Sequence, residues 1–259
     1  MGHPYELDIP SVKDQVSEAE WQVRCDLAAA YRLVADHGWD DLIYTHLSAR
    51  VPDSDHHFLM NPLGLMFDEI TASSLVKVDL GGNKVMDSPF DVNRAGFVIH
   101  SAIHEARDDA HCIVHLHTDY GIAVSNLAEG LKPLCQSSLV PYAFLAYHDY
   151  EGFAVNDDEK ARLVADMGDA KALILRNHGT LTAAPTVAAA FELMFFLEKA
   201  CRVQILTESA GMEVQGMSKQ AFDQALRDMY VVLKGDTSGS MVWPALYRRA
   251  WRLDPSFAT

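Results

Sequence analysis

Apolar residues recur at helical spacing in several segments, and the first lies near the start of the chain. Leu27, Tyr31 and Val34 fall on one face of a helix with a repeat of about 3.6 residues. The Ser-x-x-Glu sequence that begins at Ser17 fits a capping box, and Gly38 is typical of the residue that follows a helix. A helix is therefore predicted between Ser17 and Gly38. The same criteria predict later helices at 95–107, 119–127, 157–167, 186–208 and 219–233.

Between these helices lie shorter apolar or alternating segments that are typical of β-strands. A polar turn at 52–55 separates the first two, and Gly81-Gly82-Asn83 reads as a hairpin turn after the third. Helices interleaved with hairpin-linked strands indicate a mixed sheet covered by helices, which is an α/β fold. The predicted strands are 46–51, 58–61, 75–80, 112–117, 142–147 and 172–176.

The composition indicates one large domain. The chain has 259 residues, and hydrophobic residues make up 49% of them, which is ample for a buried core. No internal repeat, low-complexity tract or linker divides the sequence. We expect an N-terminal arm at 1–15 and a single domain at 16–259, which ends in a tail at 235–259 with little core pattern.

The formal net charge of −15 narrows the range of partners. An acidic surface repels phosphate backbones and anionic membranes, so we expect a small-molecule substrate and no nucleic acid or membrane partner. The longest apolar runs are far shorter than the ~20 residues of a membrane helix, and no signal-peptide pattern is seen. The four cysteines form no CxxC pair, and we expect them to be reduced. These features predict a soluble, cytoplasmic protein.

The strongest chemical signal is the pair His115 and His117 at the end of an apolar strand. Side chains of a strand alternate between faces, so both imidazoles point the same way, about 6.5–7 Å apart along the strand. Two buried polar rings are costly without partners, and two imidazoles can bind one metal ion. The pair alone does not establish a metal site, because ordinary histidines at a strand end are the more frequent explanation of such a pair.

A second apolar strand ends abruptly in the polar sequence Asn177-His178-Gly179. Functional groups of α/β folds often lie beyond strand ends, and Gly179 would let the backbone turn tightly and bring His178 inward. His178 is therefore a candidate third ligand. Sequence spacing alone does not show that the two strands are neighbours.

Taken together, the His115-Leu116-His117 and Asn177-His178-Gly179 sequences resemble the class II aldolase/adducin family. The resemblance runs from about Leu27 to Glu208, in the order and spacing of the family, and is closest to its bacterial adducin-like branch. Further segments carry it at 45–50, 61–64, 95–100 and 147–152.

This resemblance implies a three-layer α/β/α domain with a mixed, mostly antiparallel central sheet. It implies a divalent metal on His115, His117 and His178, with zinc first and manganese or iron as alternatives, since ligand type does not choose among them. It also implies homotetramers with active sites at subunit boundaries. In sugar-phosphate members the metal acts as a Lewis acid during carbon–carbon cleavage.

The chain departs from the sugar-phosphate aldolases of this family at several positions. Those enzymes carry a catalytic Glu or Asp on the helix before the HxH strand, and Gly96 stands at that position here. Without the acid, the proton transfer of an aldolase lacks its usual base, which disfavours a sugar-phosphate aldolase. The residues at the family's phosphate-binding positions also differ, and they are Arg94, Ala95, Thr45, His46 and Leu63.

Four residues are candidates for binding substrate. Arg94 could pair bidentately with a carboxylate, although a solvated Arg at a helix start is the plainer reading. Asn61 and Gly64 belong to a loop that resembles a substrate-binding loop of the family. His100 lies one helical turn after Gly96 and so faces the same side.

Three residues are candidates for acid–base catalysis. His46 could bind a substrate oxyanion or exchange a proton near neutral pH, or be an ordinary loop histidine. Tyr150 and Glu151 could act as general acid or base at the metal, within one subunit or across a boundary. The alternative for these two is a structural turn.

The residues and the resemblance predict a metal-dependent carbon–carbon lyase that acts on a small oxo- or hydroxy-carboxylic acid. Decarboxylation is slightly favoured over aldol cleavage, because decarboxylation does not need the missing base. The alternative is a non-catalytic, adducin-like oligomeric interaction module, which would have no need of three converging imidazoles.

Overall fold

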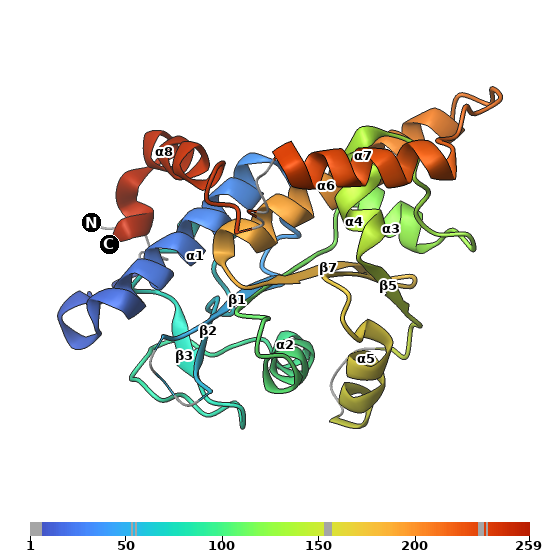
Figure 1. Cartoon of the computed structure of the whole chain (residues 1–259). Coiled ribbons are helices and arrows are strands. Elements are labelled where there is room, and N and C mark those ends of the chain that lie inside the picture. Colours follow the sequence, from blue (N-terminus) through green and yellow to red (C-terminus); the bar gives the residue numbers. More distant parts are fainter. Residues whose placement is uncertain (1–6, 53, 55, 153–156, 233–235, 237) are drawn as a thin grey trace.

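The computed structural model describes residues 7–52, 54, 56–152, 157–232, 236 and 238–259 (Figure 1). Its centre is a seven-stranded sheet with the order β3-β2-β1-β4-β7-β6-β5. Neighbouring strands are antiparallel except for the parallel pair β5 and β6, so the sheet is mixed and mostly antiparallel. The strands are β1 His46–Arg50, β2 Phe58–Met60, β3 Val76–Val78, β4 Cys112–Leu116, β5 Leu145–His148, β6 Ala172–Leu175 and β7 Gly179–Ala184.

Helices cover both faces of this sheet (Figure 1). Helices α2 (Arg94–Ala106) and α5 (Lys160–Met167) lie together on one face. The other face carries the long helices α1 (Glu18–Asp36) and α6 (Val187–Glu208), and one apolar core lies on each side of the sheet. The α/β fold expected from the sequence is confirmed. The remaining α-helices are α3 Asp119–Ser125, α4 Leu139–Ala143, α7 Lys219–Val232 and α8 Trp243–Leu253.

Local signals placed several helix ends well. Ser17 caps α1, and its hydroxyl accepts a hydrogen bond from the Glu20 amide at 3.1 Å. Asn93 caps α2 in the same way. The strand prediction at 142–147 was partly wrong, since the chain stays helical to Ala143 and the strand runs from Leu145 to His148.

Strand β7 and helix α8, like the short helix α4, were missed in the sequence. Strand β7 is fully buried between β4 and β6, and its small Gly, Thr and Ala residues carry no alternating pattern because both faces are covered. The tail beyond residue 235 was expected to have little core pattern, and this was wrong. It forms α8, which packs on α1, and both Ala250 and Phe257 are fully buried.

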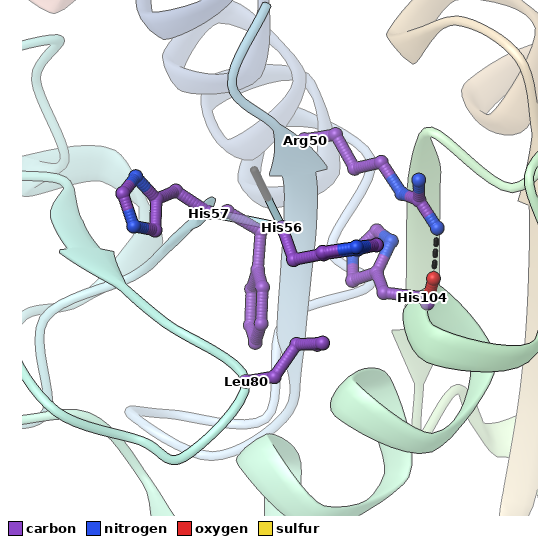
Figure 2. A pocket seen from close by; sticks show the side chains of 6 residues that line it. Arg50, His56, His57, Leu80 and His104 are labelled. Atoms are coloured by element: carbon purple, nitrogen blue, oxygen red, sulfur yellow. Dashed lines mark hydrogen bonds between the residues drawn. The ribbon is translucent and has the colours of Figure 1, made fainter. Parts of the chain in front are cut away.

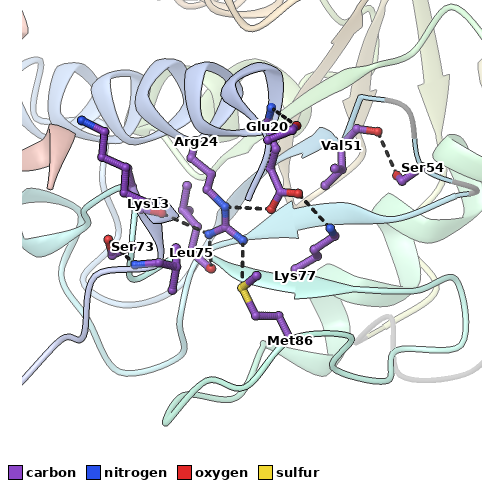
Figure 3. A network of polar contacts seen from close by, with 12 residues as sticks. Lys13, Glu20, Arg24, Val51, Ser54, Ser73, Leu75, Lys77 and Met86 are labelled. Atoms are coloured by element: carbon purple, nitrogen blue, oxygen red, sulfur yellow. Dashed lines mark hydrogen bonds and ion pairs between the residues drawn. The ribbon is translucent and has the colours of Figure 1, made fainter. Parts of the chain in front are cut away.

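A buried charge network ties α1 to the segment before β3 (Figure 3). The fully buried Arg24 guanidinium donates to Glu20 and to the backbone carbonyls of Ala72 and Leu75. Glu20 also pairs with Lys77 at 2.8 Å. Each buried charge therefore has a partner, without which its desolvation would be strongly destabilising.

The chemistry of the cysteines fits the expectation. All four thiols are free, and Cys25, Cys112 and Cys201 are buried in the core. No helix in the described part of the chain is long and apolar enough to cross a membrane.

Candidate metal centre

Strand β4 carries the first of the three candidate ligands. His115 lies within β4, opposite His46 on β1 and Leu181 on β7, and His117 follows directly after the strand's last residue. The two-residue spacing places both imidazoles on one face, as the sequence predicts, with their ring centroids 4.9 Å apart.

The turn between β6 and β7 supplies His178. The sequence interpretation assigned the tight turn to Gly179, but Asn177 takes the left-handed conformation with φ 56°. Gly179 is needed for another reason, because a Cβ there would lie 2.5 Å from the Leu116 carbonyl oxygen. Its missing side chain lets β7 approach β4, and this approach places His178 beside His117.

The three imidazoles converge. The ligand atoms of His115, His117 and His178 all lie within 4.8 Å of one another. The Nε2 atoms of His115 and His117 are 3.1 Å apart. The His178 ring centroid lies 4.8 Å from the centroids of both other rings.

Hydrogen bonds on the far sides of two rings fix which nitrogens face each other. His115 Nδ1 lies 2.9 Å from the Thr180 carbonyl oxygen, which can only accept, so Nδ1 carries the proton. His117 Nδ1 lies 3.0 Å from a carboxylate oxygen of Asp41, with the same consequence. Both Nε2 lone pairs therefore point at each other, which is repulsive unless a cation lies between them.

This donor arrangement fits a metal ion. Two nitrogens that are each about 2.0–2.1 Å from one zinc ion lie roughly 3–3.5 Å apart, which brackets the distance between the two Nε2 atoms. A metal-bound histidine also usually donates its other ring N–H to a carbonyl or carboxylate. Asp41 was missed in the sequence, because it precedes its partner His117 by 76 residues in a loop without any motif.

Burial favours the neutral, metal-binding form of these rings. Desolvation, reinforced by the neighbouring imidazoles, holds the pKa of His115 well below its usual value. The same causes lower the pKa of His178 to about 4. Metal ligands must be deprotonated, so these imidazoles are ready to bind at neutral pH without releasing protons.

The space beside Gly96 is filled by His46. A Cβ at Gly96 would lie 2.3 Å from Cδ2 of the His46 ring, which is an impossible contact. His46 is buried, and its ring centroid is 5.0 Å from that of His115. A buried imidazole, whose pKa is held well below its usual value by burial, therefore fills the space beside Gly96.

Two further features mark the loop before β1. Thr45 is a β-branched residue with φ 61°, a strained conformation that usually requires glycine. Its buried hydroxyl finds no hydrogen-bond partner among the described residues. His100 on α2 completes the group from the other side, since its Nε2 lies 2.8 Å from His46 Nδ1.

The structure separates the two acid–base candidates that follow β5. The Tyr150 ring approaches the centre from the same chain, with its centroid 6.3 Å from that of His178. Glu151 instead forms an ion pair with Arg162 on α5, in which Arg162 Nε donates to its carboxylate at 2.7 Å. The geometry thus brings Tyr150, but not the Glu151 carboxylate, toward the imidazoles.

For the remaining substrate-binding candidates, the structure gives contacts with residues outside the triad or open space. Asn61 accepts a hydrogen bond from Tyr31 at 2.9 Å, and its side-chain nitrogen has no partner in the described residues. Gly64 has φ 103° and open space around its Cα. Arg94 begins α2, and its guanidinium lies over the Phe97 ring at 5.5 Å.

Comparison with known proteins identifies the family of this chain. The family model described as "Class II Aldolase and Adducin N-terminal domain" matches residues 25–205. The chain belongs to the class II aldolase/adducin family. The match includes all three candidate ligands and ends before α7 and α8.

Solved structures extend the likeness to the rest of the chain. The aldolase II superfamily protein of Pseudomonas syringae is 46% identical, with a TM-score of 0.91, over 96% of this chain and 100% of that one. The L-fuculose 1-phosphate aldolase of Glaciozyma antarctica PI12 is 30% identical, with a TM-score of 0.81, over 95% and 94% of the two chains.

One relative represents the other branch of the family. Alpha-adducin of Rattus norvegicus is 46% identical over 198 residues, which is 75% of this chain but 27% of alpha-adducin. The family and its aldolase members support a lyase-type activity for this chain, while the adducin relatives leave a non-catalytic role open.

Proposed function

We propose that this protein is a metal-dependent carbon–carbon lyase that acts on a small oxo- or hydroxy-carboxylic acid, by decarboxylation or aldol cleavage. The observation that carries the proposal is the pair of facing Nε2 atoms of His115 and His117, 3.1 Å apart, with both Nδ1 protons already committed. A protein that only needed a scaffold would not require this repulsive arrangement. Similarity to an L-fuculose 1-phosphate aldolase supports the lyase class.

His115, His117 and His178 would hold the metal, with Asp41 orienting His117. A bound divalent cation would supply Lewis-acid stabilisation of negative charge on a substrate oxygen. Zinc is the first choice for three imidazoles, and manganese or iron remain alternatives.

The chain's own residues would handle the protons. Cleavage of a carbon–carbon bond leaves an electron pair on carbon, which a general acid must protonate. The Tyr150 phenol approaches the triad and is our candidate for this acid, and His46 would contact the substrate beside Gly96. Glu151, paired with Arg162, would order the Tyr150 segment instead of exchanging protons.

The absence of a carboxylate at Gly96 bears on the charge of the substrate. A carboxylate beside the metal would repel a substrate carboxylate, whereas the neutral His46 ring does not. Arg94, at the start of the same helix, is our candidate for pairing with that carboxylate, and Asn61, Gly64 and His100 would line the remaining wall. A carboxylic acid is thus favoured over a sugar phosphate as the substrate. We also propose a homotetramer, as the family resemblance implies.

A second function, a non-catalytic interaction module, is favoured by the similarity to alpha-adducin. Helix α7 supports it, because Tyr230, Val231 and Val232 are exposed at its end. This alternative predicts an intact oligomer with no stoichiometric metal and no turnover.

The deciding experiment measures metal content and turnover together. Purified protein is analysed by inductively coupled plasma mass spectrometry and then assayed with a panel of hydroxy- and oxo-acids, before and after chelation and zinc return. We expect about one metal per chain and activity that chelation abolishes and zinc restores. His178→Ala should lose both, whereas His111→Ala, an exposed histidine just before β4, should keep both. Activity that survives complete metal removal would overturn the proposal.

A further inference from the structure

A continuous series of buried hydrogen bonds runs from the end of α2 to the candidate metal centre. Its members are His104 and His100, one helical turn apart on α2, and Ser48 and His46, two residues apart on β1. All four side chains are buried, with exposed fractions of 4% or less. The alternation of strand side chains and the i,i+4 spacing of the helix turn these pairs toward each other.

The direction of the series is set at its far end. His104 Nδ1 lies 2.8 Å from the Ala110 carbonyl oxygen, which has no proton to give. His104 Nδ1 must therefore donate. In a neutral imidazole the other nitrogen is then an acceptor, so His104 Nε2 accepts from the Ser48 hydroxyl at 2.7 Å.

The same logic passes through the remaining members. The Ser48 hydroxyl has one proton, and it is already given to His104. His100 Nδ1, 2.5 Å from Ser48 Oγ, must donate to it, which leaves His100 Nε2 as an acceptor. His46 Nδ1, 2.8 Å from that nitrogen, must donate in turn. His46 Nε2 is left with a lone pair and has no hydrogen-bond partner among the described residues.

The surroundings keep the rings neutral, as this logic requires. Burial lowers the pKa of His104 to about 3, and the same cause holds the pKa of His100 well below its usual value. Arg50 reinforces this effect, because its guanidinium donates to the His104 carbonyl and places a positive charge at the far end (Figure 2).

The far end of the series lies beside a pocket. Beyond His104 lies a narrow pocket lined by Arg50, His56, His57, Phe58 and Leu80 (Figure 2). His104 uses both ring nitrogens within the series, so neither is available to this pocket.

We propose that Ser48, His100 and His104 are positioning residues that fix His46 as the Nδ1–H tautomer, so that His46 Nε2 accepts a hydrogen bond from a substrate hydroxyl beside Gly96. The hydrogen bond to a substrate rests on the proposed function, whereas the tautomer of His46 is a property of the protein alone. It deepens that function by naming a hydroxy-acid as the class of substrate. A ligand that offers only carbonyl or carboxylate oxygens has no proton for this acceptor.

Nitrogen-15 NMR of protein labelled at histidine distinguishes the two neutral tautomers directly, because protonated and unprotonated ring nitrogens have well-separated shifts. Signals are assigned by their loss in His46→Asn, His100→Asn and His104→Asn. In zinc-loaded wild-type protein we expect all three rings to carry the proton on Nδ1. A wild-type His46 with its proton on Nε2 overturns the proposal, whatever the variants do.

Ser48→Ala removes the link that sets the direction. The hydrogen bond between His46 and His100 can then run in either direction, with both neutral rings protonated on Nδ1 or both on Nε2, so the Nε2-unprotonated fraction of His46 should fall toward about half. Ser48→Thr keeps a hydroxyl and should restore the wild-type tautomer. The matched control is Ser101→Ala, a buried serine on α2 whose hydroxyl donates only to the Val98 carbonyl at 3.3 Å. An unchanged His46 tautomer in a folded Ser48→Ala protein would contradict the mechanism.

Ligand specificity is tested on the same spectrum. Glycolate carries a hydroxyl, and acetate does not. Glycolate should shift the His46 Nε2 resonance of the zinc-loaded protein, and acetate should leave it in place; equal shifts would overturn the specificity claim. If the protein binds zinc but turns over none of the acids in the panel, the lyase proposal fails while the tautomer result still stands or falls by itself.

Discussion

Two groups of histidines lie on the same face of the sheet, and they use their ring nitrogens in opposite ways. In the metal triad, His115 and His117 donate outward through Nδ1 and aim their Nε2 atoms at a common point. In the buried series, His100 and His104 use both nitrogens, so each ring passes its hydrogen bond to the next. In the triad the ring nitrogens converge on one point, whereas in the buried series each ring fixes the direction of the next hydrogen bond.

The difference shows what makes a histidine cluster a metal site. His115 of the triad and His100 of the series are both buried, and burial holds the pKa of each well below its usual value, so neither property separates the two groups. What separates them is whether the lone pairs are already satisfied by protein donors. Of the two groups, only the triad leaves unsatisfied lone pairs that face one another. His46 lies between the groups and has one unsatisfied lone pair, on Nε2.

The largest expected effect comes from removing a converging nitrogen. His115→Ala should weaken zinc binding by more than about 100-fold, because two imidazoles remain where three are needed for a stable site. Competition with a chromophoric chelator measures the affinity. His100→Ala, in the buried series, serves as the comparison and should keep zinc stoichiometry even if the fold is weakened. Equal zinc loss in both variants would erase the distinction between the groups.

Gly96 tests the junction of the two groups. In Gly96→Ala the new methyl would overlap the His46 ring, so we expect a loss of about 2–3 kcal/mol in the free energy of unfolding. His46→Ala in the same chain should relieve much of this, and the double variant should be more stable than the sum of the single changes predicts. Urea denaturation measures all of these.

Gly216→Ala provides the baseline for that cycle, since nothing lies within 4 Å of a Cβ at this position. It should change stability by less than about 0.5 kcal/mol. Strict additivity of Gly96→Ala and His46→Ala would mean that the His46 ring does not occupy the space beside Gly96.

The sequence allowed the triad to be predicted better than the series. His115 and His117 form a local motif at a strand end, and strand alternation alone made them co-facial. His178 needed the family resemblance, because strand neighbours cannot be read from spacing. The series depends on β1 facing α2, which no local pattern encodes, so only His46 and His100 were recognised, as separate candidates, and Ser48 and His104 were missed.

The fold shows the same division. Elements with caps or strong periodicity, such as α1 and α2, were predicted nearly to their ends. Strand β7 and helix α8 were missed because their burial comes from tertiary contacts. Strand β7 lies between β4 and β6 with all its residues buried, and small residues are enough to fill this space. Helix α8 packs through a few residues such as Ala250.

A smaller effect is expected within the buried series. His104→Phe keeps an aromatic ring, but it leaves the Ala110 carbonyl without its partner and removes the acceptor of the Ser48 hydroxyl. Unsatisfied buried groups of this kind cost about 2 kcal/mol in the free energy of unfolding. Zinc affinity should stay within about threefold of wild type, because no ligand or outer hydrogen bond of the triad changes. A large loss of zinc would show that the two groups act as one unit.

The smallest effect on the free energy of unfolding is expected at the hydrogen bond between Thr118 and Glu198, next to the triad. Thr118, the residue after His117, donates to the buried carboxyl of Glu198 on α6, and burial raises the pKa of this carboxyl to about 7. The folded protein therefore keeps a proton that the unfolded chain releases above about pH 4.5. By linkage, stability falls as the pH rises from about 4.5 to 7 through this group.

Glu198→Gln removes that dependence, because an amide stays neutral. The free energy of unfolding of the variant relative to wild type should rise across this pH window and level off above it. The full pKa shift would correspond to about 3 kcal/mol, and the weaker hydrogen bonds of an amide offset much of it, so we expect a net gain of about 1 kcal/mol at pH 8. Urea denaturation of both proteins at pH 5 and pH 8 gives the difference directly. A gain of equal size at both pH values would mean that Glu198 is already ionised in the folded protein at pH 5. Thr118 would then donate to a carboxylate instead of a neutral carboxyl.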